Sequence, residues 1–230
     1  MNPFDLVMFD LDGTLVETAP EIMDAVNDVM RQFSLPDVAQ KMVDDWIGHG
    51  TQELLVKALA QVTQSSAEAV RSSALLSQVL PVYNTAYQAR CGTRSHLYPQ
   101  VHETLLALQQ QGVKLAVVTN KEGRYTQVVL DVHQLSDLFD VVISGDTFPT
   151  KKPTPVGLVH CLERFGVTPE RALFVGDSSI DVATARAAGV PVWVLPYGYN
   201  MGEPVQDCAP DRIIQDISSL LNKELLAKTE

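Results

Sequence analysis

The sequence predicts a doubly wound α/β fold, in which helices cover both faces of a parallel sheet, with an α-helical subdomain inserted after the first strand. Short, nearly continuous apolar runs of the kind that form buried strands recur along the chain. Helical patterns alternate with these runs in the second half, which is typical of parallel sheets. Residues 10–113, between the first run and the next, contain mostly helical patterns. This segment is far longer than a plain crossover of about a dozen residues.

The strands and helices of the core are predicted from these alternating patterns. We expect strands at residues 5–9, 114–118, 140–144, 172–175 and 191–195. The first helix of this half has apolar residues on one face and Gly112 as its stop. Further helices are expected at residues 125–135, 155–165 and 180–188.

The inserted segment is predicted to begin with a helix near Thr18. Thr18 and Glu21 have the spacing of a capping box, and Pro20 fits the first turn. Other helices are expected from residue 51 to about residue 87, followed by a return link at residues 92–99. We therefore assign residues 1–16 and 94–230 to an α/β core domain and residues 17–93 to a helical cap domain.

Composition limits the possible partners and location. The chain has 230 residues, 46% of them hydrophobic, and a formal net charge of −11, which argues against nucleic acid as a partner. The three cysteines form no CxxC pair, and neither a secretory leader nor an apolar run of membrane-spanning length is present. We expect a cytoplasmic monomer or homodimer that does not bind membranes.

Chemically useful residues gather where predicted strands end, which is where ligands bind in open α/β sheets. They are Asp10 and Asp12, Thr119 and Asn120, Lys152, and Asp177 with Asp181. Taken singly, each has an ordinary explanation as a solvated turn residue, and Ser178 or Ser179 would serve as a helix cap. Their common position at one sheet edge favours a site for an anionic substrate.

Two other binding motifs are excluded by their context. Asp10-Leu11-Asp12-Gly13-Thr14 lacks the third acid, the later Glu and the flanking helices of a calcium-binding EF-hand loop. Gly48-His49-Gly50 is followed by Glu53 where a dinucleotide fingerprint needs its third Gly, and no strand precedes it. His49 is equally compatible with an ordinary surface loop.

With four motifs in this order, DLDGT, VVTN, KKP and GDSSID, the sequence resembles the haloacid-dehalogenase-like phosphatases over nearly its whole length. The stretches WIGHG, LYPQVHETLLALQQQG, AVVTNK, SGDTFPTKKPTP and PYGYN are similar to phosphoglycolate phosphatases in particular. The resemblance implies a Rossmann-like core with a cap, and hydrolysis of a small phosphorylated substrate, with 2-phosphoglycolate as the first candidate.

The resemblance also implies roles for individual residues. Asp10 would be the nucleophile that becomes an aspartyl-phosphate, and Asp12 the general acid and base. Magnesium (Mg²⁺) would be bound by Asp10, by Asp177 and by the backbone carbonyl of Asp12. Thr119, the Asn120 backbone and Lys152 would bind the phosphoryl oxygens.

Two further roles concern residues outside this central set. Asp181 would support the metal or orient Lys152. Gly48, His49 and Gly50 would carry cap contacts to the substrate, although His49 stands where phosphoglycolate phosphatases often have Asn.

Other functions remain open at this stage. A sugar phosphomutase or a phosphatase of another small sugar or acid phosphate would use the same four motifs. Dehalogenation fits less well, because it needs neither a general acid at Asp12 nor the metal ligand Asp177. A phospho-accepting signalling module would need no cap. A cysteine phosphatase is excluded, because no cysteine has Arg after the required five-residue spacing.

Overall fold

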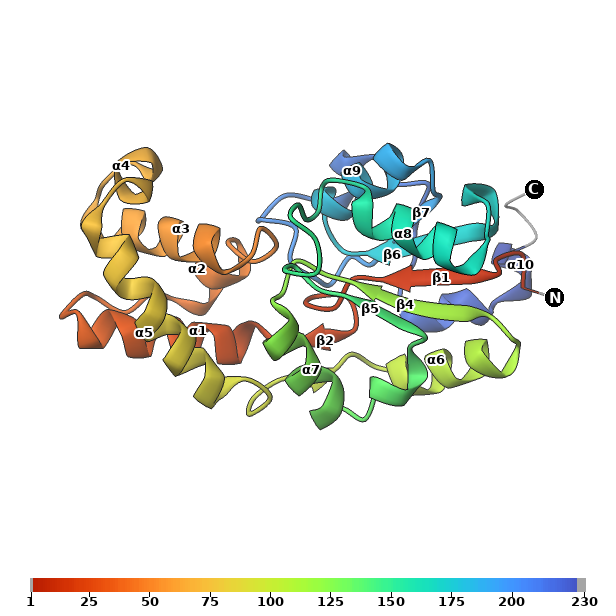
Figure 1. The fold of residues 1–230 in the computed structure, drawn as a ribbon, viewed down its shortest axis with the longest axis horizontal. Coiled ribbons are helices and arrows are strands. Elements are labelled where there is room, and N and C mark those ends of the chain that lie inside the picture. Colours follow the sequence, from red (N-terminus) through yellow and green to blue (C-terminus); the bar gives the residue numbers. More distant parts are fainter. Residues whose placement is uncertain (1, 227–230) are drawn as a thin grey trace.

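A computed structural model of the chain describes residues 2–226, which form a six-stranded parallel sheet with helices on both faces (Figure 1). The strand order is β5-β4-β1-β6-β7-β8, so β1 lies in the middle of the sheet. The strands are β1 (Leu6–Phe9), β4 (Lys114–Val118), β5 (Val141–Ile143), β6 (Ala172–Gly176), β7 (Val192–Val194) and β8 (Arg212–Ile213). The predicted doubly wound fold is confirmed. Of the six strands of this sheet, only β8 was not predicted, because two residues make no recognisable apolar run.

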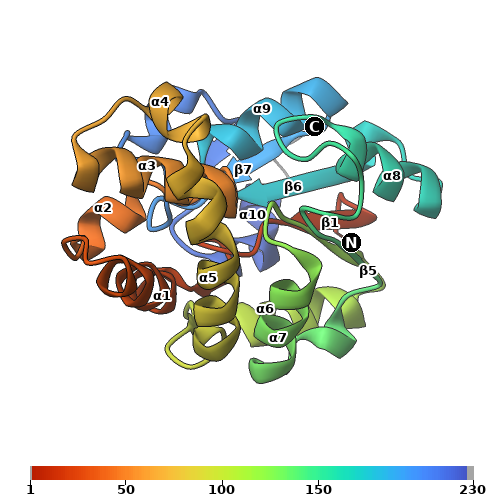
Figure 2. The ribbon, with the colours of Figure 1, turned by 60° about the vertical axis from the view of Figure 1, so that its left-hand side comes forward.

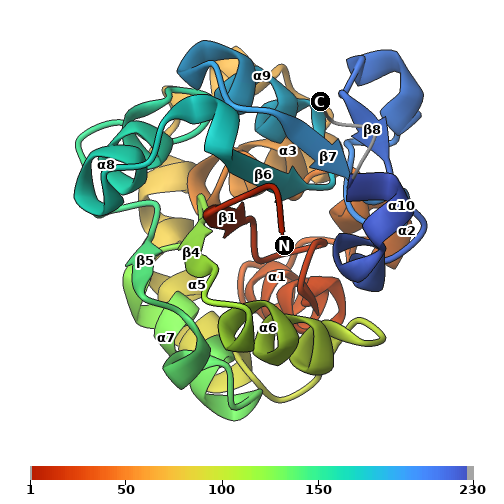
Figure 3. The same ribbon diagram turned by 90° about the vertical axis from the view of Figure 1, so that its right-hand side faces the viewer.

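The helices of the core lie in two layers. Figure 3 shows α6 (Val101–Gln110) and α7 (Gly123–Val132) on one side of the sheet, with α8 (Val156–Phe165) and α9 (Ser179–Ala188) on the other. Along β1, Leu6 and Met8 pack in the apolar cluster beneath α8 and α9, whereas Val7 and Phe9 pack on the opposite face. Because successive side chains alternate and both faces are covered, every position of β1 is apolar. The described chain ends with the short helix α10 (Lys223–Leu226).

A group of helices separates β1 from β4 in the sequence and lies beyond the carboxyl end of β1 (Figure 1). These helices are α1 (Ala19–Gln32), α2 (Gln40–Asp44), α3 (Thr51–Thr63), α4 (Ala67–Arg71) and α5 (Ala74–Arg90). Figure 2 shows the molecule turned so that these five helices come toward the viewer. The inserted helical subdomain is thus confirmed, and its boundaries at residues 17 and 93 stay a prediction. No helix among residues 2–226 is long and apolar enough to cross a membrane.

The two connections to the inserted helices pair with each other. β2 (Val16–Glu17) and β3 (His96–Leu97) form a two-stranded antiparallel ribbon. Glu21, which is fully buried, strengthens the same junction, because its Oε2 accepts hydrogen bonds from the backbone N–H groups of Arg94 and Ser95 at 3.2 and 3.0 Å.

The expected capping box at α1 is wrong. The Thr18 side chain makes no capping hydrogen bond, and its hydroxyl instead donates to Asp12 Oδ1 at 2.7 Å. The Tyr199 hydroxyl caps the start of the helix instead. It accepts hydrogen bonds from the backbone N–H groups of Thr18 and Ala19 at 3.2 and 3.0 Å. A residue far along the chain therefore fixes the entry into α1.

This contact predicts a stability effect for Tyr199→Phe. The substitution keeps the buried ring but leaves two backbone N–H groups without their acceptor, so the free energy of unfolding should fall by about 1–3 kcal/mol. Urea unfolding of the parent and the variant measures the difference. An unchanged unfolding midpoint would show that Tyr199 does not stabilise the entry into α1.

Candidate active site

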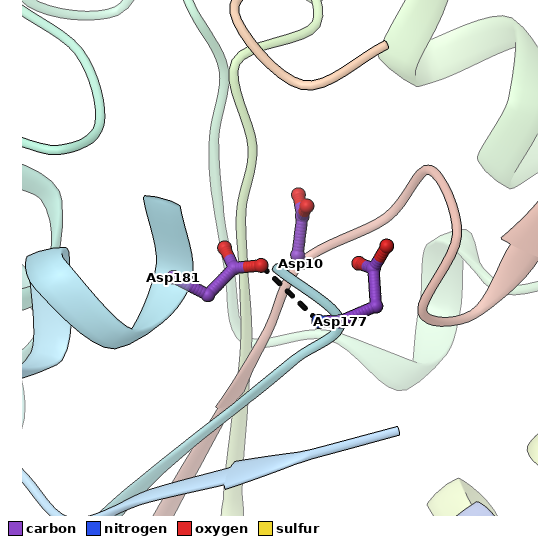
Figure 4. Close-up of side chains that lie close together, drawn as sticks. All are labelled: Asp10, Asp177 and Asp181. Atoms are coloured by element: carbon purple, nitrogen blue, oxygen red, sulfur yellow. Dashed lines mark hydrogen bonds between the residues drawn. The ribbon is translucent and has the colours of Figure 1, made fainter. Parts of the chain in front are cut away.

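Three carboxylates meet at the carboxyl ends of the central strands. Asp10 follows β1, Asp177 follows the neighbouring strand β6, and Asp181 lies in the first turn of α9. One oxygen from each carboxylate lies within 4.8 Å of the others. Figure 4 shows the Asp10 and Asp177 side chains rising side by side from their strands, with Asp181 reaching across from its helix. The sequence analysis placed Asp10 and Asp177 at one edge of the sheet, and the structure brings the two side chains together there.

Two hydrogen bonds hold the buried Asp177 carboxylate in place. Its Oδ1 accepts the Thr14 hydroxyl at 2.6 Å, and its Oδ2 accepts the backbone N–H of Tyr199. Burial, together with the nearby charges of Asp181 and Asp10, raises the pKa of Asp177 well above its usual value. The protein thus keeps this carboxyl in a place that disfavours its negative charge.

Asp10 is also buried in a place that disfavours its negative charge. Burial raises its pKa, the Lys152 ammonium opposes this rise, and the neighbouring acids Asp181 and Asp12 add to it. Together these effects bring the pKa of Asp10 from 3.8 to about 6. Asp10 Oδ1 makes no hydrogen bond within the part of the chain that is described, although Lys152 Nζ lies 2.8 Å away as an ion-pair partner.

Lys152 is the cation of this cluster. Its Nζ lies 2.8 Å from Asp10 Oδ1 and 2.7 Å from Asp181 Oδ1, and its side chain is 4% exposed. Burial opposes its charge, but Asp10 and Asp181 outweigh burial and raise the pKa of Lys152 above the ordinary lysine value. Lys152 therefore stays charged.

Asp181 has both carboxylate oxygens engaged. Oδ1 accepts Lys152 Nζ at 2.7 Å. Oδ2 accepts the backbone N–H groups of Asp177 and Ser178, both at 3.1 Å, and the Ser178 hydroxyl at 2.7 Å. Asp181 thus ties Lys152 to the loop that carries Asp177, an arrangement that suits a positioning residue better than a metal ligand.

The cluster fits a divalent cation. Asp10 and Asp181 share one ammonium, and Asp177 beside them has no ammonium partner of its own among the described residues. A bound cation would relieve the repulsion that raises the pKa values of Asp10 and Asp177. Oxygen donors of this kind suit hard ions such as Mg²⁺.

The Asp12 side chain is held apart from this cluster. Its Oδ1 accepts the Thr18 hydroxyl, and Lys121 Nζ donates to Oδ1 and Oδ2 at 2.9 and 3.1 Å. The sequence interpretation missed Lys121. The available signal was its place directly after Thr119 and Asn120 at the end of β4.

The loop after β4 also joins the core to the inserted helices. Thr119 and Asn120 are buried, and Asn120 Nδ2 donates to the Gly48 carbonyl at 2.9 Å and to the Lys152 carbonyl at 3.1 Å. The Asn120 side chain therefore connects two loops, a role the sequence did not reveal.

A cavity of about 500 Å³, including the open space at its mouth, lies between the strand ends and the inserted helices. Its walls come from both parts of the chain: Asp10, Asp12, Thr119, Asn120, Lys121 and Glu122 on one side, and Ile22, Ile47, Gly48, Gly50, Thr51, Leu54, Tyr83 and Tyr87 on the other. Gly48 and Gly50 thus face the cavity, whereas His49 between them is not part of its wall. His49 is half-buried, and burial with the nearby Lys57 lowers its pKa.

Comparison with known proteins gives a consistent result. The family model of haloacid dehalogenase-like hydrolases matches residues 7–195. The chain is 39% identical to a phosphoglycolate phosphatase from Vibrio cholerae over 99% of this chain and 100% of that protein. It is 40% identical to one from Pseudomonas putida over 94% of this chain and 78% of that protein.

The solved structures agree. A protein described as a predicted phosphoglycolate phosphatase from Haemophilus somnus superposes with a TM-score of 0.89 at 34% identity, covering 96% of this chain and 98% of that one. CbbY from Rhodobacter sphaeroides, solved in complex with phosphate, has a TM-score of 0.78 at 21% identity, covers 97% of this chain and 99% of its own, and shares the fold.

The raised pKa of Asp10 predicts a pH-dependent difference in stability between the parent and Asp10→Asn. Without metal, the unfolded chain ionises Asp10 near 3.8 but the folded chain only near 6, so the parent loses stability as pH rises through this window. The advantage of Asp10→Asn over the parent should therefore grow by about 1–3 kcal/mol between pH 4 and pH 7.

Urea unfolding in the presence of a chelator, at several pH values, measures this difference. Asp5→Asn is the matched control, because Asp5 is exposed and paired with Arg171 at 2.6 Å. A gap between Asp10→Asn and the parent that stays constant or shrinks with rising pH would refute the assigned environment of Asp10.

Proposed function

This chain belongs to the haloacid dehalogenase-like hydrolase family, and we propose that it is a magnesium-dependent phosphatase that hydrolyses 2-phosphoglycolate to glycolate and phosphate through an aspartyl-phosphate. As a phosphatase, it acts on a small phosphorylated substrate. The observation that carries the proposal is the buried group of Asp10, Asp177 and Lys152 at the carboxyl ends of the central strands, with Asp10 also in the wall of the cavity. The identity of 39% with a phosphoglycolate phosphatase over nearly the full length supports the choice of substrate.

Asp10 is the proposed nucleophile. Its carboxylate oxygen attacks phosphorus, the bond from phosphorus to the substrate oxygen breaks, and the phosphoryl group stays on Asp10. A water molecule then attacks the same phosphorus, releases phosphate and restores the Asp10 carboxylate. Lys152, 2.8 Å from Asp10 Oδ1, offsets the repulsion between this carboxylate and the anionic phosphoryl group.

Asp12 is the proposed general acid and base. In the first step it gives a proton to the leaving alkoxide, and in the second it accepts a proton from the attacking water. The hydroxyl of Thr18 and the ammonium of Lys121 hold its carboxylate at the cavity wall, two residues from the nucleophile. This placement supports a role at the leaving group.

The cation site is proposed to take Mg²⁺. Haloacid dehalogenase-like phosphatases generally use a divalent metal. Asp10, Asp177 and the backbone carbonyl of Asp12 would hold the ion, which supplies positive charge to the transferred phosphoryl group. The Thr14 hydroxyl and the Tyr199 backbone N–H orient Asp177 for this purpose.

The remaining contacts to the phosphoryl oxygens are proposed to come from Thr119, the Asn120 backbone and Lys152. All three residues are buried at the strand ends, where donors aimed at developing charge are most effective because water is excluded.

Residues 17–93 are proposed to act as a cap that encloses the substrate. Hydrogen bonds that join this segment to the core beside the cavity include Asn120 Nδ2 to the Gly48 carbonyl at 2.9 Å and the Thr51 hydroxyl to Glu122 Oε2 at 3.0 Å. Closure of the segment over the substrate would exclude water from the site. Gly48 and Gly50 of this segment line the cavity, and Gly48, His49 and Gly50 are proposed to contact the substrate.

The proposal predicts the behaviour of Asp10→Asn and of the chelated enzyme. The parent should release phosphate from 2-phosphoglycolate with Mg²⁺ present, and kcat should fall by at least about 10³-fold in Asp10→Asn or with chelator, because either change removes a component of phosphoryl transfer. A phosphate-release assay over a panel of small phosphoesters measures the loss and the ranking by kcat/KM.

Asp5→Asn serves as the control, because it removes a carboxylate close in sequence but at the amino end of β1. Activity that survives Asp10→Asn or the chelator would refute the mechanism. A panel in which another phosphoester is clearly preferred would refute the substrate.

A further inference from the structure

Lys121 is a buried lysine whose ammonium lies at the wall of the substrate cavity. Its side chain is 4% exposed, and both hydrogen bonds that its Nζ makes within residues 2–226 go to the Asp12 carboxylate. An ammonium group has three N–H donors, so Lys121 can bind one more acceptor. The Tyr87 ring, with its centroid 5.0 Å from Nζ, covers another side of the charge.

Lys121 differs from Lys152 in the charge that surrounds it. Lys152 is held between two carboxylates, Asp10 and Asp181, and has its place in the phosphoryl site. Lys121 has the single close carboxylate of Asp12, with Glu21 more distant. Burial opposes the charge of Lys121, but Asp12, Cys91 and Glu21 together outweigh burial and raise the pKa of Lys121 above its ordinary value.

The position of Lys121 in the cavity wall indicates what its charge could bind. Among the residues that the structure describes, Lys121 is the only cationic side chain in the cavity wall. Apolar side chains of Ile22, Ile47 and Leu54 line the opposite side. Glu122, the wall acid beside Lys121, accepts the Thr51 hydroxyl at 3.0 Å. A substrate whose leaving group carries a negative charge would meet Lys121 in an environment where the contact is strong, because little water competes.

We propose that Lys121 binds the carboxylate of the leaving group and thereby selects small phosphorylated acids over neutral phosphoesters. The inference rests on the phosphatase function proposed above and assigns to one residue the choice of a carboxylate-bearing substrate. The same Lys121 ammonium also binds the Asp12 carboxylate. Asp12 then lies between the charged end of the substrate and the bridging oxygen that Asp12 protonates. One lysine thus orients both the substrate and the general acid.

The test compares two substrates of equal carbon number, 2-phosphoglycolate and ethyl phosphate, in the parent and in Lys121→Met. Loss of support for Asp12 slows both substrates alike, whereas loss of carboxylate binding slows only 2-phosphoglycolate. The ratio of the two kcat/KM values should therefore fall by about 10- to 100-fold in Lys121→Met, the effect of one hydrogen bond between charged groups. Lys121→Arg, which keeps the charge, should retain part of the preference.

Two lysine variants serve as comparisons. Lys41→Met removes an exposed charge on α2, paired with Asp45 at 3.4 Å, and should leave the ratio unchanged. Lys151→Met removes the competing cation near Gly50 at the mouth of the site. A ratio that falls in Lys151→Met and not in Lys121→Met would overturn the assignment.

The parent alone also tests the inference, should Lys121→Met fail to fold. Equal kcat/KM values for 2-phosphoglycolate and ethyl phosphate would overturn it, because no carboxylate is then recognised. Equal losses on both substrates in a folded Lys121→Met would overturn the role of Lys121 while leaving the phosphatase function in place. If neither substrate released phosphate in the parent, the proposed function itself would fail, and this inference with it.

Discussion

The sharing of one buried ammonium by buried carboxylates is the constraint on which this molecule depends. Lys152 lies within 2.8 Å of both Asp10 and Asp181, yet a third carboxylate, Asp177, completes the group without a cation of its own. Burying unbalanced charge is costly, and the raised pKa values of Asp10 and Asp177 express that cost. A protein keeps such an arrangement where a cation and an anionic ligand complete it, which is the situation in a metal-assisted phosphoryl-transfer site.

The surrounding structure holds these charges in place. Asp181 uses both oxygens to join Lys152 to the loop after β6, and Tyr199 joins that loop to the start of α1. Gly13 allows a close approach: its φ is +87°, and a Cβ there would collide with the Asp177 carboxylate and the Tyr199 ring. The first turn after β1, the loop after β6 and the entry into α1 are therefore mutually dependent, so the inserted helices begin at a point fixed by the contacts of Asp177 and Tyr199.

Much of this arrangement follows from the sequence because the apolar run that forms a strand, and the residue at which the strand ends, are local properties of the chain. The apolar runs at β1, β4 and β6 predict buried parallel strands, and a parallel sheet brings their carboxyl ends to one edge. Asp10, Thr119 and Asp177 are located by that reasoning alone. The expectation that Thr18 and Glu21 form a capping box failed, because both side chains bind partners that lie outside their own helix.

The contacts of Lys121 and of the Asn120 side chain could not be predicted from the sequence. Lys121 pairs with Asp12 across 109 residues, and Asn120 reaches Gly48 across 72. No periodicity marks such pairs, because the direction of a side chain at a strand end depends on the loop that follows.

The central claim is that Asp10 carries the phosphoryl group during turnover, and chemical trapping tests it most directly. The parent enzyme is mixed with excess 2-phosphoglycolate and Mg²⁺, quenched in acid during turnover and reduced with borohydride, which converts an aspartyl-phosphate to homoserine. Peptide mass spectrometry should then find homoserine at position 10 and aspartate at positions 12, 177 and 181. Homoserine at another position, or phosphate release with no trapped residue at any time of quenching, would contradict the account.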